Sequence, residues 1–119
     1  MNLIREGKGS GTMKVTAKRI DRDLTLQLHG ELDHHGAKEV MLEIDRHLDV
    51  ALPLRTTLDF SGVSFMDSSG IAVILRLYKR MQNLGGSMRV THVQPQAMRV
   101  LRAASIGSVV TIEKEAEKL

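Results

Sequence analysis

The sequence predicts an α/β domain, in which a mixed β-sheet of about four to five strands carries three to four packed α-helices. Two observations lead to this prediction. Segments with alternating apolar residues come in turn with segments whose apolar residues recur every three or four positions, and an apparent hairpin opens the series. The 119 residues, 42% of them hydrophobic, suffice for one core. We expect a single domain over residues 13–119, after a flexible glycine-rich segment over residues 1–12.

The first expected elements are two strands joined by a tight turn. Val15 and Ala17 alternate with polar neighbours before "DRD", and so do the leucines at positions 24, 26 and 28 after it. Alternation of this kind is typical of strands that bury one face. The spacing then changes, because apolar residues at positions 37, 40, 41, 44 and 48 form the stripe of an amphipathic helix that ends before Pro53.

The second half of the chain repeats the order of strand and helix. "RTTLDFSG" alternates as a strand and leads through "VSFMD" to a helix whose apolar positions are 71, 74, 75, 78, 81 and 84. Gly85 and Gly86 give that helix a carboxy-terminal stop. "SMRVTHV" predicts a strand, "PQAMRVLRAASI" a helix that starts with proline, and "SVVTIE" a last strand. The tail "KEAEKL" is at most a short charged helix.

Composition excludes several classes of function. The longest apolar run, Ile71 to Leu75, is five residues long, whereas a membrane-spanning helix needs about 20, so we expect no membrane association. The chain has no cysteine, which excludes disulfides and favours a cytoplasmic location. Its 17 basic residues are scattered among 14 acidic ones and only 3% of residues are aromatic, so we expect no nucleic-acid partner.

Two adjacent serines stand where a strand gives way to a helix, in "FMDSSGIAVIL". Ser68 is a candidate for the amino-terminal cap, since its hydroxyl can accept from the N–H of Gly70 or Ile71, and Asp67 or Ser69 are alternatives for that role. A phosphate on Ser68 would lie where the N–H groups and dipole of the helix favour negative charge. Phosphorylation would then change the charge of a docking surface without unfolding the domain.

No catalytic, metal or cofactor site is expected. The nucleophile elbow G-x-S-x-G does not match "MDSSG", and the sequence places no histidine beside Ser68, so an enzyme that uses this serine ranks last among the hypotheses. Asp33, His34 and His35 are metal-ligand types, but further ligands at a recognisable spacing are missing. "GKGSGTMK" does not follow the order of a phosphate-binding loop.

Three segments together resemble the STAS domain, and in particular anti-sigma factor antagonists of the bacterial sporulation type. They are "GELDHH", "LDFSGVSFMDSSGIAVIL" and "GGSMRVTHVQPQAMRVL". The resemblance covers nearly the whole chain, from about Met13 to Glu113. Its most specific elements are the "ELDHH" block and, later in the chain, the D-S-S-G string with the F-M that precedes it.

The resemblance implies a protein switched by phosphorylation. In this family the unphosphorylated antagonist binds an anti-sigma factor that is itself a serine kinase, and thereby releases the sigma factor. Phosphorylation abolishes that binding, and a PP2C-type phosphatase restores it. The acceptor is the first hydroxyl residue after the aspartate, which here is Ser68. The residues alone do not distinguish Ser68 from Ser69.

The same resemblance implies a docking surface around Ser68. Its expected members are residues of the motif and of the loop before the first helix, with Gly70 allowing close approach: Asp33, His34, Asp67, Ser69 and Gly70. From its position beside the serines, we also expect Met66 to be partly exposed for partner contact. The alternative hypothesis is a STAS domain that serves as a ligand-sensing or scaffold module, in which Ser68 only caps a helix.

The chain also departs from the family pattern. Gly36 stands where a helix-starting Thr or Ser is more typical, which predicts a poorly capped first helix. The family usually carries a longer carboxy-terminal helix than "EKEAEKL" allows, and the basic balance of charge is unusual for it.

Overall fold

The computed structural model describes residues 13–114, so the predicted flexible segment 1–12 and most of the charged tail lie outside the described residues. Strands and helices alternate along the chain after an opening hairpin. In order they are β1 (Met13–Ile20), β2 (Asp23–Leu32), α1 (His34–Ala51), β3 (Arg55–Met66), α2 (Ser68–Asn83), β4 (Ser87–Val93), α3 (Pro95–Ala103), the one-turn 3₁₀-helix η1 (Ile106–Ser108) and β5 (Thr111–Lys114).

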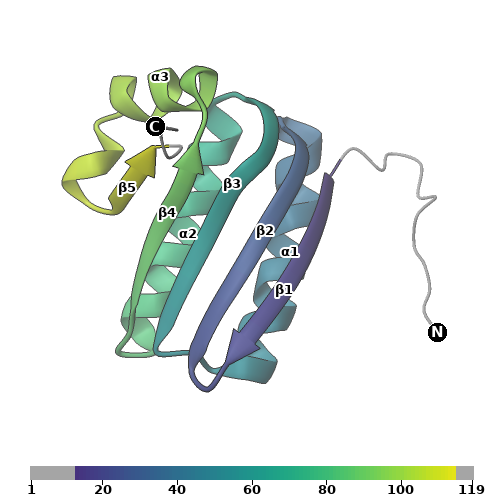
Figure 1. The fold of residues 1–119 in the computed structure, drawn as a ribbon, viewed down its shortest axis with the longest axis vertical. Helices are drawn as coiled ribbons and strands as arrows, with labels where there is room; N and C mark the ends of the chain where they lie inside the picture. The colour runs from purple at the N-terminus through teal and green to yellow at the C-terminus, as the bar shows by residue number, and fades with distance from the viewer. Residues whose placement is uncertain (1–12, 115–119) are drawn as a thin grey trace, which may run out of the picture.

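The strands form one mixed sheet in the order β1-β2-β3-β4-β5 (Figure 1). β1 runs antiparallel to β2, and the other neighbours are parallel. The hairpin turns at Asp21, whose φ of 56° is left-handed, which Asp tolerates better than most residues. The predicted α/β fold is confirmed, with five strands and three α-helices within residues 13–114.

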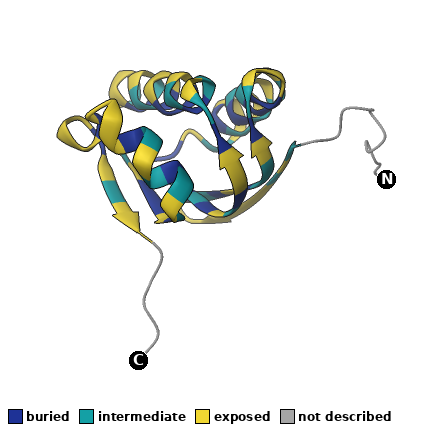
Figure 2. Ribbon diagram, turned by 90° about the horizontal axis from the view of Figure 1, so that it is seen from above, coloured by how far each residue is buried: buried dark blue, intermediate teal, exposed yellow. Residues whose placement is uncertain are grey.

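The core lies between the sheet and the helices α1 and α2, which cover the same face (Figures 1 and 2). α3 lies at the carboxyl ends of β3 and β4, at the top in Figure 1. Phe60 and the three predicted leucines of β2 are buried, as are Val40, Ile44 and Leu48 of the predicted α1 stripe. Buried leucine, valine and isoleucine from both layers supply the main stabilisation of the fold.

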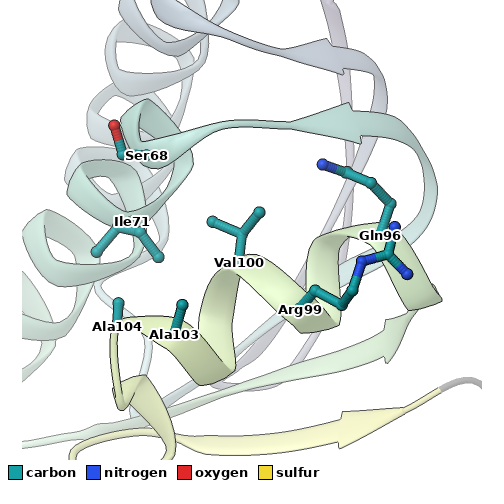
Figure 3. Close-up of a pocket in the computed structure, with 7 residues that line it drawn as sticks. All are labelled: Ser68, Ile71, Gln96, Arg99, Val100, Ala103 and Ala104. Carbon is teal, nitrogen blue, oxygen red and sulfur yellow. The ribbon is translucent and has the colours of Figure 1, made fainter.

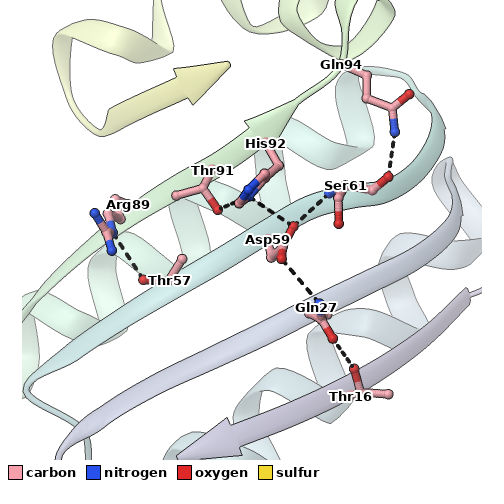
Figure 4. A network of polar contacts seen from close by, with 9 residues as sticks. All are labelled: Thr16, Gln27, Thr57, Asp59, Ser61, Arg89, Thr91, His92 and Gln94. Atoms are coloured by element: carbon pink, nitrogen blue, oxygen red, sulfur yellow. Dashed lines mark hydrogen bonds and ion pairs between the residues drawn. The ribbon is translucent and has the colours of Figure 1, made fainter. Parts of the chain in front are cut away.

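Polar side chains occupy the opposite face of the sheet, where they are linked across strands (Figure 4). Gln27 accepts from the Thr16 hydroxyl at 3.2 Å and donates to Asp59 at 3.3 Å. Asp59 also accepts from the Ser61 N–H at 2.8 Å, and the His92 ring lies 3.5 Å from it. Burial alone would raise the pKa of Asp59, but the bonds from Ser61 and Gln27 and the nearby His92 together lower it.

Helix α2 faces the core with a different set of residues from the one predicted. Ile74 and Met81 are buried as expected, but Leu75 is 40% exposed and Ile71 is half-buried. The buried stripe consists instead of Gly70, Val73, Ile74, Leu77 and Met81. The difference arises because the apolar surface of α2 is wider than one stripe: Ile71 borders a groove against α3, and Leu75 borders another against α1.

The carboxy-terminal elements are shorter than predicted. α3 ends at Ala103 rather than at Ile106, and Ser105 adopts a left-handed φ of 55° that breaks the helix. Ile106 is buried in η1, which takes up residues 106–108. The last strand therefore begins at Thr111.

Candidate functional site

Two helices begin side by side at the carboxyl edge of the parallel strands. The register of β2 and β3 pairs Leu32 with Met66, and the Asp67 N–H donates to the Leu32 carbonyl at 3.4 Å. The residues that follow this pair, Asp33 and Asp67, are therefore neighbours, and each immediately precedes a helix. His34 opens α1 at the same edge, which is where parallel α/β sheets commonly bind their ligands.

Asp67, not Ser68, caps α2. Asp67 has an extended backbone (φ −117°, ψ −166°), and its Oδ1 accepts from the Ser69 N–H at 2.7 Å. The prediction that Ser68 caps the helix is wrong, and the alternative that Asp67 does so is confirmed. The physical reason is that β3 continues to Met66. Asp67 therefore keeps an extended backbone at the N-cap position, and Ser68 is the first helical residue.

The Ser68 hydroxyl is consequently not needed to cap the helix. Ser68 is exposed, and its hydroxyl forms no hydrogen bond to any group within residues 13–114. Ser69 is half-buried and contributes its N–H to the cap. The two serines, which the residues alone did not separate, therefore differ in accessibility.

Met66 and Gly70 lie beneath the serines and face inward. Met66 is 0% exposed, so the expectation that it is partly exposed for partner contact is wrong: as the last residue of β3 it points into the core. Gly70 is also buried, and a Cβ on it would lie 2.6 Å from Met66 Cγ and 3.1 Å from Leu32 Cδ2. Gly70 allows the helix to approach its own domain, which places it under the docking surface predicted from the resemblance.

The start of α1 is well capped, contrary to the expectation drawn from Gly36. Asp33 Oδ1 accepts from the Gly36 N–H at 2.8 Å. Gly36 is buried, and a Cβ there would lie 2.5 Å from the Glu31 carbonyl oxygen. The glycine is thus required by packing, while His34 and His35 are exposed on the first turn.

Beside Ser68, a groove runs between α2 and α3 (Figure 3). Gln96 ties α3 to the end of β3, two residues before α2 begins, because its amide donates to the Met66 carbonyl at 2.9 Å and accepts from the Met66 N–H at 2.9 Å. Its lining residues are Ser68, Ile71, Gln96, Arg99, Val100, Ala103 and Ala104. Sequence analysis did not find this groove. The segment "PQAMRVL" marked a helix, but no pattern in it shows which helix it would face.

Comparison with known proteins identifies the family. The family model described as the STAS domain matches residues 14–119. The chain belongs to the STAS domain family. This STAS domain is 35% identical over 89 residues to an anti-sigma F factor antagonist of Paenibacillus polymyxa, an alignment that covers 75% of this chain and 76% of the relative. It is also 23% identical over 105 residues to the anti-sigma-B factor antagonist of Bacillus subtilis (strain 168), covering 88% and 94%.

Solved structures of anti-sigma factor antagonists have the same fold. The anti-sigma factor antagonist SpoIIAA in its unphosphorylated form superposes with a TM-score of 0.72 at 22% identity, covering 86% of this chain and 90% of that one. SpoIIAA of Bacillus in its phosphorylated form gives 0.64 at 21% identity, covering 86% and 93%. An anti-sigma factor antagonist from Mycobacterium paratuberculosis gives 0.76 at 18% identity, covering 85% of each chain.

The geometry of the site suits a group that receives a modification. Ser68 offers an exposed hydroxyl, with no histidine hydrogen-bonded to it in the part of the chain that the structure describes. Over the same residues there is no cluster of three or more His, Cys, Asp or Glu side chains that would hold a metal ion. None of the helices described is long and apolar enough to cross a bilayer.

Proposed function

We propose that this STAS domain is an anti-sigma factor antagonist controlled by phosphorylation of Ser68. Its unphosphorylated form binds an anti-sigma factor that is a serine kinase and so frees the sigma factor. The observation that carries the proposal is the exposed Ser68 hydroxyl on the first turn of α2, with Asp67 acting as the cap. The proposal is supported by relatives named as antagonists of anti-sigma factors and by SpoIIAA, which has been solved in unphosphorylated and phosphorylated forms.

The position of Ser68 makes phosphorylation compatible with the folded state. Because Asp67 already caps α2, no structural hydrogen bond has to break when the hydroxyl is modified. A phosphate carries about −1.5 to −2 charges at pH 7, and the helix amino terminus favours such charge. Phosphorylation at Ser68 therefore alters the surface charge rather than the fold.

The docking surface that this function requires is formed by side chains around Ser68. Asp33, His34, Asp67 and Ser69 lie at the same edge of the sheet and are its proposed members. Met66 and Gly70, which were also expected at this surface, are buried and support it from below. A PP2C-type phosphatase would remove the phosphate, and the whole cycle would run in the cytoplasm without catalysis by this chain.

Phosphosite mapping tests the proposal. The purified chain is incubated with ATP and the anti-sigma serine kinase of the same organism, and the products are analysed by mass spectrometry. We expect one phosphate on Ser68, absent in Ser68→Ala and retained in the matched control Ser69→Ala. Phosphate on Ser69 would contradict the choice of Ser68 as acceptor. No phosphate, with a kinase that modifies another substrate, would contradict the proposal and favour the scaffold or ligand-sensing hypothesis.

A further inference from the structure

The groove beside Ser68 combines an apolar floor with a single charged side chain. Ile71 on α2 and Val100 on α3 face each other across it, and two alanines complete the apolar lining (Figure 3). Arg99 is the one charged residue among those that line the groove. A segment that fills the groove would thus meet aliphatic surface and one guanidinium group.

Arg99 has no charged partner of its own within residues 13–114. It is exposed and takes part in none of the ion pairs or side-chain hydrogen bonds of the described chain. The arginines at the other groove of α2 differ: Arg76 lies 2.7 Å from Asp45, and Arg80 lies 2.9 Å from Asp45 and 3.0 Å from Asp49. The guanidinium of Arg99 is therefore available to an anion from outside.

The surroundings of Arg99 leave the groove positive. α3 contains no acidic residue, and Arg102 adds a second exposed cation one turn further along. The first half of α2, "SSGIAVIL", carries no charged side chain. Asp67 is the acidic residue next to Ser68, and its Oδ1 is engaged by the Ser69 N–H. Charge complementarity therefore favours a ligand that carries a carboxylate.

We propose that the anti-sigma factor segment that docks beside Ser68 presents an aliphatic side chain to Ile71 and Val100 and a carboxylate to Arg99. This inference rests on the proposed function. It also explains why phosphorylation would weaken binding rather than strengthen it, because a phosphate on Ser68 repels a partner segment that carries negative charge.

Charge reversal at Arg99 tests the inference. The affinity of the unphosphorylated chain for its purified anti-sigma kinase, with ADP present so that no phosphate can be transferred, is measured by calorimetry for the wild type, Arg99→Glu and Lys79→Glu. Lys79 is the matched control, because it is an exposed cation on α2 that lines the other groove. We expect Arg99→Glu to weaken binding by about tenfold or more and Lys79→Glu by no more than about twofold. Arg99→Gln should reduce the salt dependence of the affinity.

The outcomes separate this inference from the proposed function. Suppose that the wild type binds and phosphorylation releases it, but Arg99→Glu binds as well as Lys79→Glu does. The proposed carboxylate contact to Arg99 is then wrong, while the proposed control by phosphorylation of Ser68 is retained. If the wild type does not bind the kinase, the proposed function and this inference both fail. Arg99 is exposed, so thermal unfolding should show both variants folded at the wild-type melting temperature.

Discussion

The two helix starts at the carboxyl edge, residues 33–36 and 67–70, are built in the same way. Each follows directly after a strand, begins with an aspartate that caps the helix, and has a buried glycine three residues later. They differ in the two residues that lie between the aspartate and the glycine. The first presents two exposed histidines, whereas the second presents an exposed Ser68 beside the groove against α3 and a half-buried Ser69.

This comparison separates residues that the fold requires from residues that function requires. Asp67 caps α2 and Gly70 allows its close packing, and Asp33 and Gly36 have the same two roles at the start of α1. Their presence is therefore explained by capping and close packing. What the fold leaves unexplained is an exposed hydroxyl that bonds to nothing in the described chain, next to an apolar groove with one free cation.

The largest effect on stability is expected from the two glycines. In Gly36→Ala the new Cβ meets the Glu31 backbone carbonyl at 2.5 Å, which cannot move aside, so we expect a loss of about 1–3 kcal/mol. In Gly70→Ala the nearest atoms belong to the flexible side chain of Met66, and the higher helix propensity of alanine offsets part of the strain. Urea unfolding measures both. A greater loss in Gly70→Ala than in Gly36→Ala would show that the two starts are packed differently from this description.

The two capping aspartates should contribute similar amounts to the free energy of unfolding. Asp33→Ala and Asp67→Ala each remove one side-chain acceptor from a helix start, and each should cost about 1 kcal/mol in the free energy of unfolding. Asparagine at either position keeps an acceptor and should recover most of that loss. An Asp67→Ala variant as stable as the wild type would mean that Asp67 is there for a partner rather than for the helix.

The smallest effect on stability is expected at the serine itself. Ser68→Ala removes an exposed hydroxyl without a hydrogen-bond partner in the described chain, so the free energy of unfolding should change by less than about 0.5 kcal/mol. Thermal or urea unfolding measures it against Asp67→Ala. A loss above about 1 kcal/mol would assign Ser68 a structural role after all.

The sequence predicted the fold because its periodicities mark the elements, but it did not fix where one element gives way to the next. β3 pairs with β2 through two register shifts, one between Gln27 and His29 and one between Gly30 and Glu31, and over this stretch the simple alternation of buried residues in β3 is lost. "VSFM" therefore does not read as the end of a strand. Without that end point, the choice between Asp67 and Ser68 as the cap stayed open.

The groove between α2 and α3 could not be predicted from local sequence patterns, for a different reason. It joins Ser68 and Ile71 to residues some thirty positions later, and the link between them is the pair of bonds from Gln96 to Met66. A glutamine in the first turn of a helix carries no signal of such a contact. The offset of the buried face of α2 has a related cause, since Ile71 faces α3 rather than the sheet.

The most direct test of the central claim is the affinity of the chain for its anti-sigma kinase before and after stoichiometric phosphorylation of Ser68. The account predicts tight binding by the unphosphorylated form and by Ser68→Ala. It predicts a loss of at least about a hundredfold on phosphorylation, with the circular dichroism spectrum unchanged, because the modification changes surface charge and leaves α2 capped by Asp67. Equal affinity of the two forms, or a loss of affinity that accompanies unfolding of the domain, would contradict it.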